Sequence, residues 1–154
     1  STVEDGGAVA VSSGTITAVS TRFVSNRADG NGGAMSVVGG NARLDACVFD
    51  SNSAAVSGGA LFVGSNGRVE MHEQTLLTAN EAPEGSALRL NSTDGFLSYQ
   101  RPSPLGYWLA TERQKAGNIE GSFPFACPAG VFGDGATPEE QNGPWCSGTC
   151  PAGR

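Results

Sequence analysis

The sequence is poor in charged, basic and aromatic residues. Charged residues make up 16% of the 154 positions, aromatic residues 7%, and the chain has a single histidine and a single lysine, Lys115. Helical bundles and coiled coils are rich in Ala, Glu, Lys, Leu and Arg, and a nucleic-acid partner needs a basic surface, whereas the net charge here is -6. No apolar run approaches the ~20 residues that span a membrane. These absences exclude a helical fold class. We therefore expect no nucleic-acid partner and no direct membrane insertion.

Glycine, by contrast, is abundant. The chain has 23 glycines, roughly twice the usual share. They do not fall on every third position, which excludes collagen, and 38% hydrophobic residues exclude a disordered chain driven by charge. Much glycine with few charges therefore favours short strands joined by tight turns.

The glycines belong to an internal repeat. A Gly-Gly-Ala landmark recurs at steps of 26, 26 and 27 residues, its last copy reading Gly85-Ser86-Ala87. An apolar landmark recurs at Phe23, Phe49 and Leu76, and an asparagine landmark at Asn26, Asn52 and Asn80 is followed two residues later by alanine. Repeats of this length are typical of solenoids, in which each copy packs on the next.

The alternation of side chains predicts which residues of each repeat face the core. In the first strand one face is large and apolar: Val9, Val11, Met35, Val37, Leu61, Val63, Leu88 and Leu90. The other is small or mixed, and we expect it outside: Ala8, Ala10, Ala34, Ser36, Ala60, Phe62, Ala87 and Arg89. This flat, apolar outer stack, represented by Ala8, Ala34, Ala60, Phe62 and Ala87, is either a contact surface or covered by the C-terminal segment.

Two further strands are expected in each repeat. The second places Ile16, Ala42, Val69 and Phe96 in register, which makes Arg43 and Glu70 neighbours on the outer face. The third carries Phe23, Phe49 and Leu76 inward, with Cys47 level with Thr21 and Gln74 as a free, partly buried thiol.

The repeat predicts an all-β chain folded as a right-handed parallel β-helix of about 3.5 to 4 coils, each of 26 to 28 residues, over residues 1–98. Stacked asparagines Asn26, Asn52 and Asn80 would form a ladder at one turn. The Gly-Gly pairs would serve the opposite corner, where a positive φ or close contact between coils tolerates only glycine. Terminal coils expose core and strand edges unless capped, so we expect further coils or a neighbouring subunit to stack on this chain.

The residues Gly32-Gly33-Ala34-Met35 and Phe49-Asp50-Ser51-Asn52-Ser53-Ala54 resemble the repeats of the polymorphic outer membrane protein type of right-handed β-helix. That family occurs on bacterial surfaces and in large extracellular proteins of algae and other protists. The resemblance covers about residues 5–98 and implies an extracellular origin.

The repeat is lost after Tyr99, where residues 99–126 are expected to form a connector containing Pro and Gly. Residues 127–154, with Cys-Pro-Ala-Gly twice, resemble the start of the cysteine-rich modules of growth-factor and ephrin-type receptors. That resemblance implies a disulfide between Cys127 and Cys146 in an irregular, disulfide-rich extension. Such bonds persist in oxidising, extracellular compartments.

No catalytic constellation is found, and we predict neither an enzyme nor a cofactor or metal site. Glycoside chemistry needs paired carboxylates, whereas Asp29, Asp45, Asp50 and Glu70 are scattered over different strands and turns, and His72 has no nucleophile beside it. The sequon at Asn91 predicts a glycan on an extracellular turn.

We therefore expect a structural or adhesive module of a large extracellular surface, matrix or appendage protein. It would act as a rigid solenoid that assembles with other protein subunits or with further coils of the same chain. The alternative is a carbohydrate-binding or polysaccharide-degrading β-helix whose active site lies outside this segment.

Overall fold

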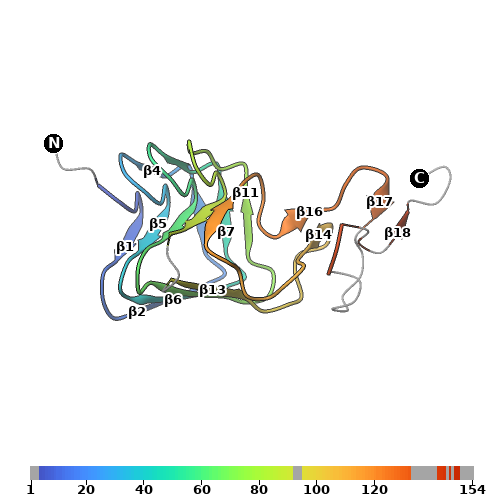
Figure 1. Cartoon of the computed structure of the whole chain (residues 1–154), viewed down its shortest axis with the longest axis horizontal. Coiled ribbons are helices and arrows are strands. Elements are labelled where there is room, and N and C mark those ends of the chain that lie inside the picture. Colours follow the sequence, from blue (N-terminus) through green and yellow to red (C-terminus); the bar gives the residue numbers. More distant parts are fainter. Residues whose placement is uncertain (1–3, 92–94, 133–141, 145, 147, 150–154) are drawn as a thin grey trace.

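The computed structural model describes residues 4–91, 95–132, 142–144, 146 and 148–149. Strands and no helices occur in these ranges (Figure 1). Three walls of parallel strands wind around a common axis and are supplemented by a two-residue pair at one turn. The first wall is β1 (Val9–Val11), β5 (Met35–Val37), β9 (Leu61–Val63) and β12 (Leu88–Leu90); the second is β2 (Thr15–Val19), β6 (Asn41–Asp45), β10 (Arg68–Met71) and β13 (Phe96–Tyr99); the third is β3 (Arg22–Val24), β7 (Val48–Asp50) and β11 (Leu76–Thr78); the short pair is β4 (Arg27–Ala28) and β8 (Ser53–Ala54).

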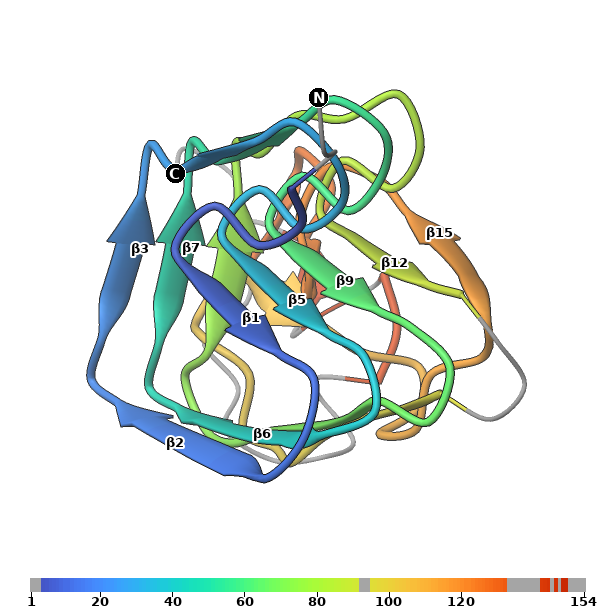
Figure 2. The same ribbon diagram turned by 90° about the vertical axis from the view of Figure 1, so that its left-hand side faces the viewer.

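This is the expected parallel β-helix, with three full coils and two strands of a fourth. Seen from its N-terminal end in Figure 2, the chain runs clockwise through β1, β2 and β3 as it recedes from the viewer, so the winding is right-handed. The handedness agrees with the general preference for right-handed crossovers between parallel strands.

The first wall confirms the predicted register and inner face. Met35 lies opposite Val9 and Leu61, and Leu88 lies opposite Leu61. The apolar face forms the core, since its members in the second to fourth coils are all at most 2% exposed. At the third wall the Phe23 and Phe49 rings stack with centroids 4.6 Å apart.

The predicted register is wrong in the fourth coil of the second wall. Leu97, not Phe96, lies opposite Val69, and Tyr99 lies opposite Met71. The connection from the first to the second wall is one residue longer here than in the coil before: five residues lie between Val63 and Val69, and six lie between Leu90 and Leu97. Because side chains alternate, this single residue exchanges the two faces of the strand.

The third wall contains a similar slip. Leu77, fully buried, lies opposite Phe49, whereas the predicted Leu76 pairs with Val48 and is half-buried. Consequently Cys47 is level with Thr75, whose hydroxyl accepts a hydrogen bond from the Cys47 amide at 3.3 Å, and not with Gln74. The spacing Phe-x-x-Asn in the first two coils matches Leu77 and Asn80, so the asparagine was the better landmark.

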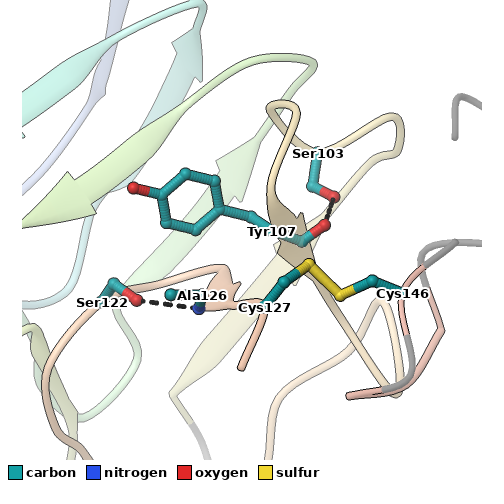
Figure 3. The surroundings of a disulfide bond; sticks show 6 residues. All are labelled: Ser103, Tyr107, Ser122, Ala126, Cys127 and Cys146. Carbon is teal, nitrogen blue, oxygen red and sulfur yellow. Dashed lines mark hydrogen bonds between the residues drawn. A yellow bond between two sulfur atoms is a disulfide. The ribbon is translucent and has the colours of Figure 1, made fainter. Parts of the chain in front are cut away.

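The C-terminal extension holds the predicted disulfide between Cys127 and Cys146, with Cα atoms 6.1 Å apart (Figure 3). It also contains two short antiparallel pairs: β14 (Tyr107–Trp108) with β16 (Phe125–Ala126), and β17 (Val131–Phe132) with β18 (Gly148–Thr149). Near the disulfide, the Ser103 hydroxyl donates to the Tyr107 carbonyl at 3.0 Å. Cys150 lies outside the described residues.

Candidate functional site

The predicted asparagine ladder is present and connects three coils. The Oδ1 atom of Asn52 accepts hydrogen bonds from both the backbone amide and the side-chain amide of Asn26, each at 2.9 Å. Asn80 accepts from Asn52 in the same way, also at 2.9 Å. The side-chain amides of Asn52 and Asn80 then donate to the Phe23 and Phe49 carbonyls. Each buried turn is therefore satisfied by the coil beside it.

A second polar ladder was not predicted from the sequence. It is built by the residue before each Gly-Gly pair, where the Asn31 amide donates to the Asp5 carboxylate at 2.6 Å and the Ser57 hydroxyl donates to Asn31 Oδ1 at 2.6 Å. The signal was available, because positions 5, 31, 57 and 84 all carry oxygen-bearing side chains. Both ladders fix the axial register of neighbouring coils.

The Gly-Gly corner needs glycine for two different reasons. The first glycine of each pair has a φ between 66° and 76°, which favours a residue without Cβ. The second touches the next coil, so that a Cβ on Gly33 would lie 2.0 Å from the Gly59 carbonyl oxygen. The series ends with Ser86 in the fourth coil, against which the described residues place the antiparallel strand β15 (Gly117–Ile119) and not another coil. The side chain is accommodated there, and its hydroxyl accepts from the Gly121 amide at 2.8 Å.

The expectation that the alanine stack lies outside is wrong. Ala34, Ala60 and Ala87 are fully buried in the core, and Ala8 alone is exposed. In the first three coils the alanine and the residue after it donate to one carbonyl, as Ala34 and Met35 do to Ala60 at 3.0 Å. The shared carbonyl marks a bend of the backbone just before each strand, so the alternation of the strand does not extend to the alanine and both side chains turn inward. Phe62 does face outward but is only 7% exposed, its ring lying over Gly64.

The C-terminal end of the β-helix is closed by the segment that we expected only to connect. β15 (Gly117–Ile119) pairs antiparallel with β12, Arg113 bridges to Ser98 of β13, and Phe123 exchanges two backbone hydrogen bonds with Leu77 of β11 at 2.8 and 2.9 Å. All three walls thus end on antiparallel partners. Phe123 and Leu109 are fully buried, and the Phe123 ring packs against Tyr99 at 5.9 Å.

Glu120 takes the place of a further coil at the glycine corner. Its two carboxylate oxygens accept the backbone amides of Gly85 and Ser86, each at 2.7 Å. In the coils below, these amide positions donate to carbonyls of the next coil, as Gly33 does to Gly58. Hydrogen bonds from Ser86 and Gly85 hold the pKa of the Glu120 carboxyl below its usual value, because they favour the charged form.

A Glu120→Gln variant should therefore lose stability in a pH-dependent manner. The depressed pKa contributes stability that is present above the ordinary glutamate pKa of about 4.3 and is lost as the pH falls through the lower, folded-state value. We expect a deficit of at most about 1 kcal/mol at pH 7, because the side chain is largely in solvent. The measurement is urea unfolding of both proteins from pH 7 to pH 2.5, and a deficit that persists unchanged at pH 2.5 contradicts the assignment.

The N-terminal end differs from the closed end. Among the described residues, β1, β2, β3 and β4 each pair on one side alone. Phe23 of the first coil keeps 9% exposure whereas Phe49 above it has none, and Val19 and Val24 are 60% and 42% exposed. In the next two coils, the Oδ1 atoms of Asn52 and Asn80 each accept two hydrogen bonds. The equivalent Oδ1 atom of Asn26 accepts none within the described part of the chain. The open end thus presents one half of the contact that joins successive coils.

The remaining predicted sites are placed as follows. Cys47 is a free thiol, as expected, but it is fully buried and not partly buried, and burial raises its pKa. Asn91 is exposed directly after β12, while the other two sequon residues lie outside the described ranges, so its glycan stays a prediction. Arg43 and Glu70 are neighbours in register, but their ion pairs form along the strands, Arg43 with Asp45 at 3.9 Å and Arg68 with Glu70 at 3.2 Å.

His72 is half-buried, and its Nδ1 lies 2.6 Å from Gln100 Oε1. No group of three or more His, Cys, Asp or Glu side chains that could hold a metal ion occurs in the described ranges. Nor do those ranges contain a helix able to cross a membrane.

Comparison with known proteins identifies one repeat. The family model of the Chlamydia polymorphic membrane protein repeat matches residues 46–64. This stretch runs from the third wall through Asn52 and the Gly58-Gly59 corner to the end of β9, and the same landmarks recur in the other coils. The chain therefore carries a repeat of the polymorphic membrane protein type on a β-solenoid. No curated protein and no solved structure matches the chain.

Proposed function

We propose that this chain is a rigid scaffold segment of an extracellular surface protein, and that its open N-terminal end stacks on another β-helix coil. The observation that carries the proposal is the difference between the two ends. One end is sealed by antiparallel strands and by Glu120, and the other leaves strand edges, apolar side chains and Asn26 Oδ1 ready for one more coil.

The expected occupant is a coil of the same repeat, supplied by the same polypeptide or by another subunit. Such a coil would bring an asparagine above Asn26, whose amide groups would donate to Asn26 Oδ1 as Asn26 itself donates to Asn52. It would also pair the free edges of β1, β2 and β3, which are otherwise prone to unspecific association. The repeat type, the disulfide and the continuous core support a structural and adhesive role at a cell surface.

Catalysis is not part of this proposal. The matching repeat comes from a surface protein family. On the outer face of the second wall, Asp45 and Glu70 are each engaged by an arginine of their own strand, whereas glycoside hydrolysis uses two carboxylates that flank a bond.

Hydrogen exchange followed by mass spectrometry tests the stacking. At low protein concentration we expect amides of β1, β2 and β3 to exchange much faster than those of β6, β9 and β10. At high concentration, where sedimentation reports self-association, the protection of β1 to β3 should rise while that of β15 stays constant. Equal, slow exchange of β1 to β3 and β9 in a strictly monomeric sample would overturn the proposal, because that end would then need no partner.

A further inference from the structure

The outer face of the second wall carries a row of guanidinium groups that the scaffold role does not use. Arg43 on β6 and Arg68 on β10 point outward, with side chains 50% and 52% exposed. Arg113 follows beyond β13, bridged to Ser98. With strands about 4.8 Å apart, the row spans about 14 Å along the solenoid axis, on the wall seen at the bottom of Figure 2.

Two of these guanidinium groups are held in place by one aromatic ring. The Arg68 guanidinium carbon lies 4.1 Å from the centroid of Phe96, and that of Arg113 lies 4.9 Å from it. Phe96 is brought to the outer face by the same one-residue shift that sends Leu97 into the core. Stacking restrains the long side chains before any ligand arrives, which lowers the entropy lost on binding.

The guanidinium groups retain free donors. Arg68 reaches Glu70 through Nε alone, at 3.2 Å, so within the described residues its two Nη groups have no hydrogen-bond partner. Arg113 makes no ion pair in the described part of the chain, and Arg43 stands at 3.9 Å from Asp45. The carboxylates nearby, Asp45, Glu70 and Glu112, each lie against an arginine, and Glu112 is paired with Arg101 at 3.5 Å, so the free Nη donors of Arg68 and Arg113 stay available.

The same wall is hollowed in two places. One hollow of about 300 Å³ is lined by Thr15, Thr17, Asn41, Ala42, Arg43, Arg68 and Glu70. A second, of about 280 Å³, is lined by Glu70, Met71, His72, Ser98, Tyr99, Gln100 and Glu112. Because Glu70 borders both, the two hollows are adjacent along the axis and together cross four coils. The lining of both hollows includes hydroxyl, amide and charged groups beside apolar surface of about equal area.

We propose that this wall binds an extended acidic polysaccharide, lying along the solenoid axis, through Arg43, Arg68 and Arg113. Carboxylate or sulfate groups on a sugar chain would take the free Nη donors in bidentate fashion, and the sugar hydroxyls would find Thr15, Asn41 and Ser98. An acidic peptide is the less suitable ligand, because neither of the two hollows, as far as the described residues line them, is a mainly apolar pocket that could anchor its side chains. A neutral sugar is also less suited, because the Phe96 ring is already covered by the two guanidinium groups.

The test uses the whole chain immobilised on a biosensor, with polygalacturonate as the carboxylated probe and dextran sulfate as the sulfated probe. Unmodified dextran is the neutral control and polyglutamate the acidic peptide control. We expect at least one of the two acidic polysaccharides to bind, with an affinity that falls as salt is raised, and dextran not to bind. An R68Q/R113Q double variant should weaken binding about tenfold or more, which corresponds to roughly 1.4 kcal/mol.

Arg22→Gln is the matched control, because Arg22 is an exposed arginine on the third wall. It removes one charge from the protein and should change the affinity less than twofold. Unchanged far-UV circular dichroism and unfolding midpoints show that the variants are folded. The proposal is overturned if neither polysaccharide binds, if polyglutamate binds as well with the same arginine dependence, or if R22Q weakens binding as much as the double variant. The site lies on a side wall, so this result is independent of the stacking test at the N-terminal end.

Discussion

An Asn52→Leu variant should unfold about 3 kcal/mol more easily than the wild-type protein. The Asn52 side chain is fully buried and joins three coils, accepting from Asn26 and donating to Asn80 and to the Phe23 carbonyl. Leucine has a similar volume but none of these groups, so the Asn26 amide and the Phe23 carbonyl lose their partners. Each such loss costs about 1–3 kcal/mol. Urea denaturation followed by far-UV circular dichroism measures the difference.

Asn26→Leu is the control for this prediction. Asn26 lies at the open end of the ladder and is half-buried, and its backbone amide still donates to Asn52 Oδ1 after the substitution. We expect a loss of about 1 kcal/mol. If both variants lose the same free energy, the interior position of Asn52 is not what makes its hydrogen bonds important.

A Gly33→Ala variant should be destabilised still more, by about 4 kcal/mol or to the point where no folded protein accumulates. The new Cβ would lie 2.0 Å from the Gly59 carbonyl oxygen and 2.6 Å from the carbonyl carbon and oxygen of Ser53. All three atoms belong to the backbone and cannot rotate away: one lies in the next coil, and two lie in the turn of the chain that leads into that coil. The two coils would have to separate, which would break hydrogen bonds along the corner. The yield of soluble protein and its thermal unfolding are the measurements.

Gly14→Ala separates crowding from backbone conformation. Gly14 has a φ of 76°, but a Cβ there meets no atom within 4 Å. Its substitution should cost about 1–2 kcal/mol, the cost of placing an L-residue in the left-handed region. A Gly33→Ala variant no less stable than Gly14→Ala would show that the coils can move apart at little cost.

The period of the repeat made the coil architecture predictable. The errors in the predicted register arose where the chain departs from that period. Where the connections keep their length, as between β1 and β9, side-chain alternation placed the core residues within the strands correctly. At two connections that have one residue more, those before Leu97 and Leu77, the predicted faces were exchanged. The buried alanines show a different limit of the alternation rule. The rule holds within a strand, but the alanine lies just before each strand, where two amides share one carbonyl.

The closure of the C-terminal end was not predictable in this way. Residues 99–126 have no period and were expected only to connect, whereas the structure has an antiparallel bridge from Arg113 to Ser98. Glu120, Phe123 and Ile119 meet the solenoid only because the chain folds back across three walls. No spacing in the sequence marks them, because each contact joins a repeating element to a segment that occurs once.

The sequence by itself determined the solenoid, its right-handed coils, the asparagine ladder, the glycine corner and the Cys127–Cys146 bond. These features either recur in each repeat or are implied by the resemblance to known families. Because equivalent residues of successive coils stack on one another, the spacing in the sequence directly predicts their contacts. The tertiary structure alone decided which end is sealed, which alanines are buried and where Arg68 and Arg113 meet over Phe96. Those outcomes depend on chain reversals and on a one-residue change in a single connection, whose effects appear only when distant segments are placed side by side.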